Sequence, residues 1–225
     1  MDSNFQINQS IKLIKSKNMK NKASYRERLK EIIDLSCDIF CRKVEEGMIV
    51  VPNEASFQLH LGTIMKMVGQ LFEFNAKDRF VINLETPIEI EATVKSANGM
   101  ARCDIELCFY YGSTCKAKAL IELKHFRKDK NEAVTDNRFS LFKDLGNLEI
   151  YKKVEPSSLI CCAIVLTDNV NYTKSETNSK INIGEGVTSP KTIVYTSNKT
   201  ITLDNEYTFH WESYSEDCHL LKILF

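Results

Sequence analysis

The sequence predicts an α/β protein in which a central mixed β-sheet is flanked by helices. Apolar residues recur at helical spacing in residues 24–44, 53–72 and 137–153. Residues 80–126 and 157–168 instead have the alternating or continuous apolar runs of strands. With 225 residues and no evident linker or repeat, the chain is long enough to form one domain with a sizeable core. We therefore expect a single domain over residues 1–225.

Residues 1–45 are expected to form a basic arm followed by a helix. Residues 1–30 carry eight basic and two acidic side chains, whereas the rest of the chain carries 22 basic and 28 acidic ones. Ser24 and Glu27 have the spacing of a capping box at the start of the helix. The basic arm could contact a polyanion, and a solvated terminus is the alternative interpretation.

A second helix is expected to begin after Asn53, which can cap it. Its apolar residues, including Phe57 and Leu61, recur every three or four positions. Glu54 lies three residues before Phe57 and seven before Leu61, so it points the same way as the buried side of the helix. A glutamate in a first turn is also explained by the helix dipole.

Three antiparallel strands are expected next, in the region 80–126. Asn98-Gly99 is a strong hairpin signal between the first two strands. A short turn at Gly112–Ser113 leads into the third strand, which ends near Phe126. This pattern predicts a three-stranded meander.

The remaining elements follow a charged loop. Residues 137–153 predict a helix, and "SSLICCAIVLTD" (157–168) is the continuous apolar run of a central strand covered on both faces. Residues 168–191 are polar and predict an exposed loop. Alternating patterns in 191–203, 206–214 and 219–225 predict late strands, so residues 169–225 are expected to form a C-terminal β extension.

Composition favours a cytoplasmic protein that does not enter a membrane. No apolar stretch approaches the roughly 18–20 residues of a membrane helix, and the N-terminus lacks the apolar core of a signal peptide. The eight cysteines have no zinc-like spacing, although Cys37 and Cys41 lie one helical turn apart and could share a ligand. Buried, reduced thiols are the favoured interpretation.

The third strand of the meander, "KAKALIELKHF" (116–126), places charges inside an apolar run. Because side chains alternate in a strand, Glu122 and Lys124 share one face while Ile121 and Leu123 take the other. Asp104 lies on the neighbouring strand and can reach the same face. Two carboxylates this close favour a bound divalent cation, since hard Mg²⁺ prefers oxygen ligands. The alternative is an exposed edge strand with a surface ion pair.

The pieces "RCDIEL" and "LIELKHF" resemble the PD-(D/E)xK nuclease superfamily of restriction-endonuclease-like proteins. That family has an aspartate on one strand and E-x-K on the next, within a core ordered α-βββ-α-β. The resemblance covers about residues 50–168, so the N-terminal helix and the C-terminal strands would be additions to that core. Cys103 stands where the family pattern has proline.

The resemblance implies the roles of individual residues. Asp104, Glu122 and the backbone carbonyl of Leu123 would bind Mg²⁺, with Mn²⁺ able to substitute. Lys124 would position or activate the attacking water, and Glu54 would complete the site directly or through a water. Nucleic acid would be contacted by basic and polar residues beyond the motif and on the following helix, namely Arg127, Lys128, Lys143 and Asn147. His125 falls on the face opposite Glu122 and is not assigned to catalysis.

The resemblance therefore implies a divalent-metal-dependent endonuclease that hydrolyses DNA, of a restriction or defence type and capable of acting as a homodimer. Local basic patches, at residues 12–30 and 124–130, would supply DNA affinity despite a net charge of zero. A nuclease acting on RNA or branched DNA is an open alternative. So is a catalytically inactive nucleic-acid-binding or protein-interaction module, because fold does not fix function.

Overall fold

The computed structural model describes residues 23–89, 100–128, 134–154, 159–176 and 181–225. Its helices are α2 (Tyr25–Glu45), α3 (Glu54–Gln70), α4 (Val134–Val154) and the 3₁₀ helix η1 (Val170–Tyr172). Its strands are β1 (Asp78–Glu89), β2 (Met100–Tyr111), β3 (Thr114–Phe126), β4 (Leu159–Thr167), β5 (Thr192–Thr196), β6 (Lys199–Thr202), β7 (Trp211–Ser215) and β8 (Cys218–Leu224).

The main sheet of the described chain is mixed and has six strands in the order β1-β2-β3-β4-β8-β7. β1, β2 and β3 form the predicted antiparallel meander, and Gly112, with a φ of 62°, makes the turn between β2 and β3. β4 returns parallel to β3, and β8 pairs antiparallel with β4. The predicted α/β class with a mixed sheet and flanking helices is confirmed. The predicted Asn98-Gly99 turn lies outside the described residues.

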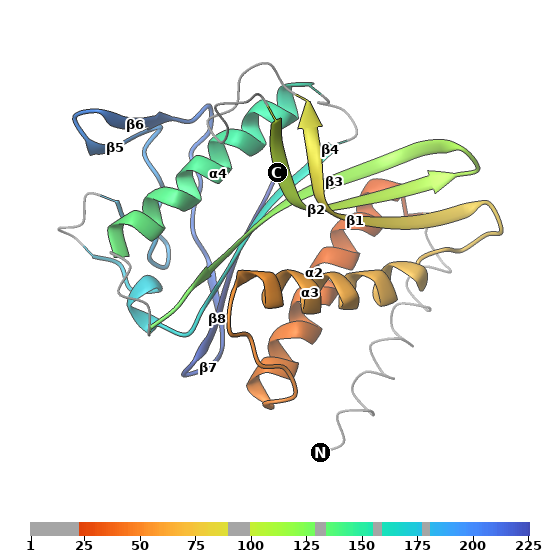
Figure 1. The fold of residues 1–225 in the computed structure, drawn as a ribbon, viewed down its shortest axis with the longest axis horizontal. Helices are drawn as coiled ribbons and strands as arrows, with labels where there is room; N and C mark the ends of the chain where they lie inside the picture. Colours follow the sequence, from red (N-terminus) through yellow and green to blue (C-terminus); the bar gives the residue numbers. More distant parts are fainter. Residues whose placement is uncertain (1–22, 90–99, 129–133, 155–158, 177–180) are drawn as a thin grey trace.

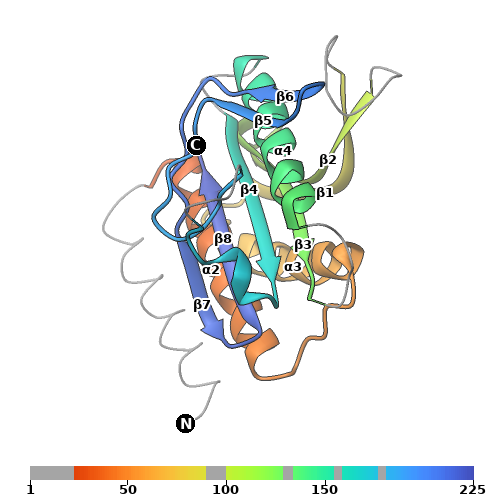
Figure 2. The same cartoon turned by 90° about the vertical axis from the view of Figure 1, so that its left-hand side faces the viewer.

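Helices cover both faces of this sheet, and each covered face has its own core (Figures 1 and 2). α2 and α3 pack on one face, where Ile105, Ile121 and Leu123 are completely buried. α4 packs on the opposite face, where it meets Cys103 and Val165. β3 and β4 lie between the two cores, so their side chains alternate between them.

The two N-terminal helices begin where the sequence predicts. The Ser24 side chain accepts a hydrogen bond from the Glu27 amide and the Glu27 carboxylate accepts one from the Ser24 amide, which completes the capping box. The Asn53 side chain accepts from the Ser56 amide at 2.8 Å and so caps α3. These caps place Glu54 in the first turn of α3, facing β3.

The β1–β2 hairpin changes direction at Glu85 and Asp104. On one side of this point, Ile105 and its neighbours on β2 pack against α2 and α3, whereas Ala101 and Cys103 on the other side join the α4 core. Glu85 has a φ of 53°, the left-handed conformation that side chains other than glycine rarely adopt. The hairpin therefore has two arms: one extends beyond α4 and the other runs beside it (Figure 1).

Two predictions for the C-terminal region need correction. Residues 168–191 are not simply an exposed loop, because Tyr172, Ile181 and Ile183 are buried in the α4 core. β8 is an internal strand of the main sheet, between β4 and β7. The β5–β6 hairpin forms a separate two-stranded sheet that lies against α4 (Figure 2).

Candidate active site

β3 is a central strand, so the exposed-edge interpretation of its charges is wrong. It pairs with β2 on one side and β4 on the other. Glu122 is only 1% exposed and points toward the α4 side of the sheet, whereas Leu123 points into the α2–α3 core. A carboxylate at this depth requires compensating polar or charged groups.

Asp104 meets β3 where the ladder between β2 and β3 ends. The last paired residues are Ile105 and Ile121. Beyond them, the Asp104 Oδ2 atom accepts a hydrogen bond from the Leu123 amide at 2.6 Å. Asp104 therefore lies close to the Glu122–Lys124 segment, as predicted. Burial, followed by the nearby charges of Glu122 and Asp104, raises the pKa of the Cys103 thiol well above its ordinary value.

Glu54 reaches the same place from the first turn of α3. Its Oε2 atom accepts a hydrogen bond from the His125 amide at 3.3 Å, and its Oε1 atom lies 3.8 Å from the Lys124 Nζ. Desolvation raises the pKa of Glu54, and this effect, with the repulsion of Asp104 and Asp144, outweighs the opposing attraction of Lys124. Because its side chain is still 47% exposed, Glu54 lies at the mouth of the site.

The Lys124 ammonium is surrounded by oxygen atoms. It lies 2.9 Å from the Asp144 Oδ2 and donates a hydrogen bond to the Leu123 carbonyl at 3.0 Å. Asp144 lies on α4, its side chain is 2% exposed, and the sequence analysis did not identify it. Its position was detectable, since it lies three residues after Leu141 and four before Leu148, inside the apolar stripe of the helix.

Gln58 is a second residue that the sequence analysis missed. It lies one turn after Glu54, and its Nε2 atom donates to the Asp104 carbonyl at 2.7 Å and to the Glu85 carboxylate at 2.9 Å. These two bonds hold α3 to both strands at the point where the hairpin bends. The left-handed backbone at Glu85 is a strained conformation, and such conformations often occur at functional sites.

The four residues predicted to contact nucleic acid lie in different environments. On α4, Lys143 is exposed, whereas Asn147 is completely buried and neither atom of its amide has a hydrogen-bond partner among the described residues. Arg127 donates to the Pro52 carbonyl. Lys128 pairs with Asp217 at 3.1 Å, and its amide donates to Asp168. Both basic residues thus have partners within the protein.

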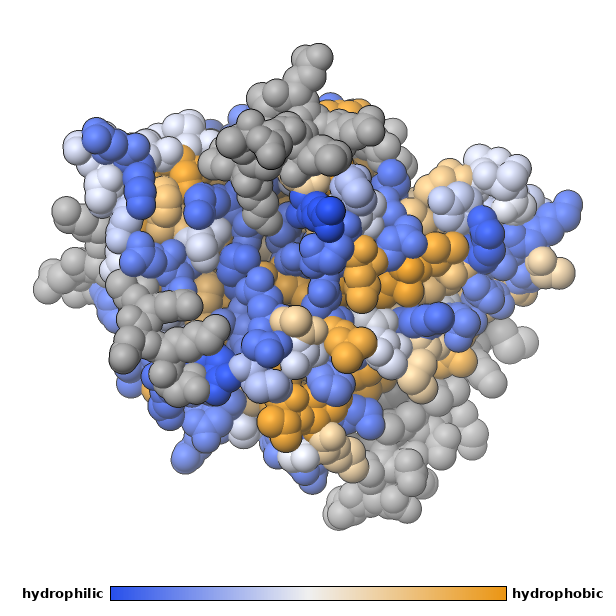
Figure 3. Space-filling view, viewed as in Figure 1, coloured by the Kyte–Doolittle hydropathy of each residue, from blue (hydrophilic) through white to orange (hydrophobic). Residues whose placement is uncertain are grey.

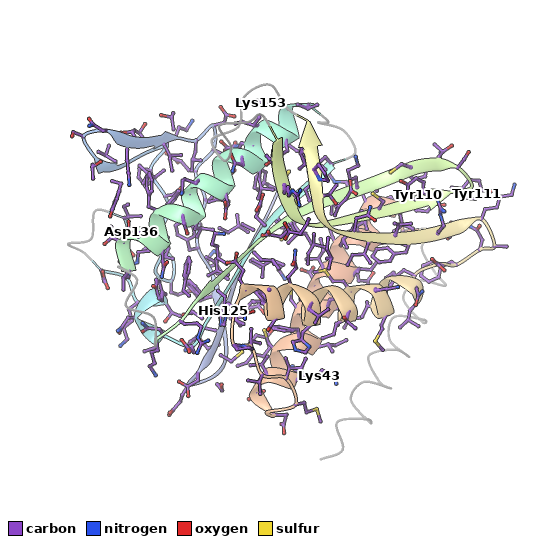
Figure 4. All side chains as sticks on the ribbon, viewed as in Figure 1. Lys43, Tyr110, Tyr111, His125, Asp136 and Lys153 are labelled. Atoms are coloured by element: carbon purple, nitrogen blue, oxygen red, sulfur yellow. The ribbon has the colours of Figure 1, made fainter. Side chains whose placement is uncertain are left out.

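His125 lies on the α3 side of β3, as predicted. Its ring centroid is 6.3 Å from that of Phe57. Figure 4 shows it beside the N-terminal end of α3. It therefore lies on the opposite side of the sheet from Glu122. Between α3 and α4, the surface in Figure 3 is mostly hydrophilic.

Oxygen atoms of the kind that a hard cation such as Mg²⁺ prefers surround the Lys124 ammonium. They belong to a carbonyl and two carboxylates. Within the described residues, no group of three or more His, Cys, Asp and Glu side chains is arranged to hold a metal ion. Asp104, Glu122 and the Leu123 carbonyl would leave other coordination positions to water, as is usual for Mg²⁺.

Comparison with known proteins returned no match: no family model, curated protein or solved structure is significantly similar to the chain. None of the helices in the described residues is long and apolar enough to span a membrane.

Proposed function

We propose that the protein is a divalent-metal-dependent endonuclease that hydrolyses DNA phosphodiester bonds. The observation that carries this proposal is the convergence of acidic and basic groups from three elements on one point of β3. Glu54 comes from α3, Asp104 from β2, and Glu122 and Lys124 from β3 itself.

In this proposal Asp104, Glu122 and the Leu123 carbonyl hold Mg²⁺ or Mn²⁺, and Glu54 completes the site directly or through a water. The metal would supply an activated water and stabilise charge on the phosphate. Lys124 would orient the attacking water or offset negative charge on the phosphate oxygens. Asp144, which the sequence resemblance did not include, would fix the position of the Lys124 ammonium through the 2.9 Å ion pair.

A restriction or defence role and homodimer formation are further parts of the proposal and rest on the sequence resemblance alone. A cytoplasmic location is also proposed and rests on composition. The alternative of an inactive binding module makes a different prediction, namely that nucleic acid binds without being cut. RNA and branched DNA are the alternative substrates.

A cleavage assay tests the proposal. Supercoiled plasmid, single-stranded DNA, branched DNA and RNA are incubated with the protein in Mg²⁺, in Mn²⁺ and in EDTA, beside Lys124→Ala and the control Lys66→Ala, at an exposed lysine of α3 outside the site. We expect metal-dependent cutting of DNA that falls about 100-fold or more in Lys124→Ala and changes little in Lys66→Ala. Cutting that persists in EDTA, or that survives in Lys124→Ala, would contradict the proposed mechanism.

A further inference from the structure

One face of the meander carries basic and aromatic side chains and is not covered by a helix of the described chain. The arm of β1, β2 and β3 that extends beyond α4 packs on α2 and α3 through Phe80, Phe109 and Ala117. Their neighbours in the strands point the opposite way. We call this second surface the open face: Arg79, Val81, Asn83, Glu106, Tyr110 and Lys118, with Cys108 buried among them. Figure 1 shows this arm extending past the end of α4, and Figure 4 shows Tyr110 and Tyr111 on it.

The central pair of the open face is Arg79 and Tyr110. They lie opposite each other in the β1–β2 ladder, and the guanidinium carbon of Arg79 lies 4.8 Å from the centre of the Tyr110 ring. Arg79 is exposed and Tyr110 is partly exposed. The guanidinium thus lies over the ring, and unpaired bases stack on aromatic rings and on guanidinium groups of this kind.

The charge of the open face suits a polyanion. Lys118 faces the same way as Tyr110. The acidic member, Glu106, is largely buried, with a side chain 12% exposed. It lies 3.6 Å from Lys118 and accepts a hydrogen bond from Asn83. The more exposed charged side chains of the open face, Arg79 and Lys118, are therefore basic.

The open face also adjoins the candidate active site. Lys118 lies six residues before Lys124 on the same strand and on the same side of it, a separation of roughly 20 Å. Asn83 and Glu106 of the open face lie beside the bend at Glu85 and Asp104. A strand of nucleic acid bound on the open face would therefore be within a few nucleotides of Glu54 and Lys124.

We propose that the open face binds single-stranded nucleic acid, by stacking a base on the Arg79–Tyr110 pair and by contacts of Arg79 and Lys118 with phosphates. Stacking requires a base with a free face, which a duplex does not offer along its length. This inference rests on the proposed function in one respect: if the candidate active site is a nuclease site, the substrate delivered to it would contain an unpaired segment.

The test measures binding in EDTA, where cleavage does not interfere. Fluorescence anisotropy is recorded with labelled 20-nucleotide oligothymidine, oligouridine and a 20-base-pair duplex, for the wild type, Tyr110→Leu, Tyr110→Phe and Arg79→Gln. The matched control is Lys199→Gln, because the Lys199 ammonium lies over Tyr195 at 5.5 Å on the separate β5–β6 sheet.

We expect the wild type to bind a single strand, of either sugar, more tightly than the duplex. Tyr110→Leu should weaken this binding about five- to a hundredfold, while Tyr110→Phe and Lys199→Gln should keep it. Arg79→Gln should weaken binding. It should also reduce, by about 0.7, the magnitude of the slope of the logarithm of the binding constant against the logarithm of the salt concentration. Duplex preference, absence of binding, or equal loss in Lys199→Gln would overturn the inference.

Together with the cleavage assay, the binding experiment separates the two proposals. Single-strand binding that depends on Tyr110, in a protein that cuts no substrate, would support the binding face and reject the nuclease. Metal-dependent cutting with binding that is unchanged in Tyr110→Leu would support the nuclease and reject the binding face.

Discussion

Asp144 and Lys124 form a close ion pair in the candidate site, at 2.9 Å, and Asp144 is the more deeply buried partner. Removing the ammonium would leave a buried carboxylate without this compensation, which costs more than the pair contributes. We expect Lys124→Met to lower the free energy of unfolding by about 3 kcal/mol. The double variant Lys124→Met, Asp144→Asn should recover much of that loss. Urea unfolding in EDTA measures the free energy of unfolding of the single and the double variant.

The expected recovery is specific to this pair. Lys124→Met combined with Asp136→Asn, a change at an exposed aspartate on the same helix, should be as unstable as Lys124→Met alone. If the two double variants have equal stability, Asp144 does not depend on Lys124, and its proposed role in positioning the lysine is wrong.

Asp78 makes stability depend on acid pH. Its burial acts to raise its pKa, but hydrogen bonds from Tyr25, Arg28 and the Phe74 amide outweigh that effect and hold the pKa below its usual value. A carboxyl group with a lowered folded-state pKa contributes stability above its unfolded-state pKa and loses that contribution as pH falls through its folded-state pKa. The affected range lies below about pH 4.

Asp78→Asn should therefore be less stable than the wild type near neutral pH, by about 3 kcal/mol. The difference should shrink as the pH falls below about 4, because protonation removes the same charge from the wild type. Thermal or urea unfolding from pH 7 to pH 3 measures this convergence. A constant difference across the range would show that the lost stability does not come from the charge of Asp78.

At the scale of elements, two glycines on α3 have different surroundings. A Cβ atom at Gly69 would lie 2.2 Å from the ring of Phe80, which is buried in the α2–α3 core. A Cβ atom at Gly62 would lie 3.4 Å from Leu84, an ordinary contact. Gly69 thus allows α3 to approach β1 closely and so helps to place Glu54 and Gln58 at the site.

Gly69→Ala should destabilise the protein by about 1–3 kcal/mol through overpacking. Gly62→Ala should be neutral or stabilising by up to about 1 kcal/mol, because alanine is the better helix former. Chemical denaturation of the two variants provides a direct comparison on one helix. Equal effects of both substitutions would contradict the close packing of α3 on Phe80.

Much of this arrangement follows from local signals in the sequence. Ser24, Asn53 and Gly112 mark helix starts and a turn through their own backbone chemistry, and the structure agrees at each. Glu122 was noticed because it interrupts an apolar run. Asp144 also interrupts an apolar pattern, but that pattern is the stripe of a helix. At the border of such a stripe, a buried polar residue is harder to distinguish from an exposed one.

Features that depend on distant contacts were not predictable in the same way. The bend at Glu85 is fixed by Gln58, which lies 27 residues earlier in the chain. The pairing of β8 with β4 joins two strands that lie far apart in the chain. Neither leaves a periodic pattern in the sequence, so both required the structure.

At the scale of the whole molecule, β8 connects the two cores. Leu220 packs in the α2–α3 core and Leu221 in the α4 core, and both are buried. β8 also pairs with β4, whose residues are all buried. β7 and β8 are therefore part of the main sheet and should unfold together with the candidate site.

Leu221→Ala should lower the free energy of unfolding by about 2–5 kcal/mol, the usual cost of a large-to-small change in a core. Val194→Ala, at a 50%-exposed position on β5, should change it by less than about 0.5 kcal/mol. Trp211 is the single tryptophan and lies on β7, so its fluorescence reports on the C-terminal strands, while circular dichroism reports on all helices. In the wild type and in Leu221→Ala, the two signals should change at the same denaturant concentration, because one cooperative unit contains both cores. A fluorescence change well before the loss of helix would show that β7 and β8 unfold alone, and that residues before β5 form the stable unit that carries the site.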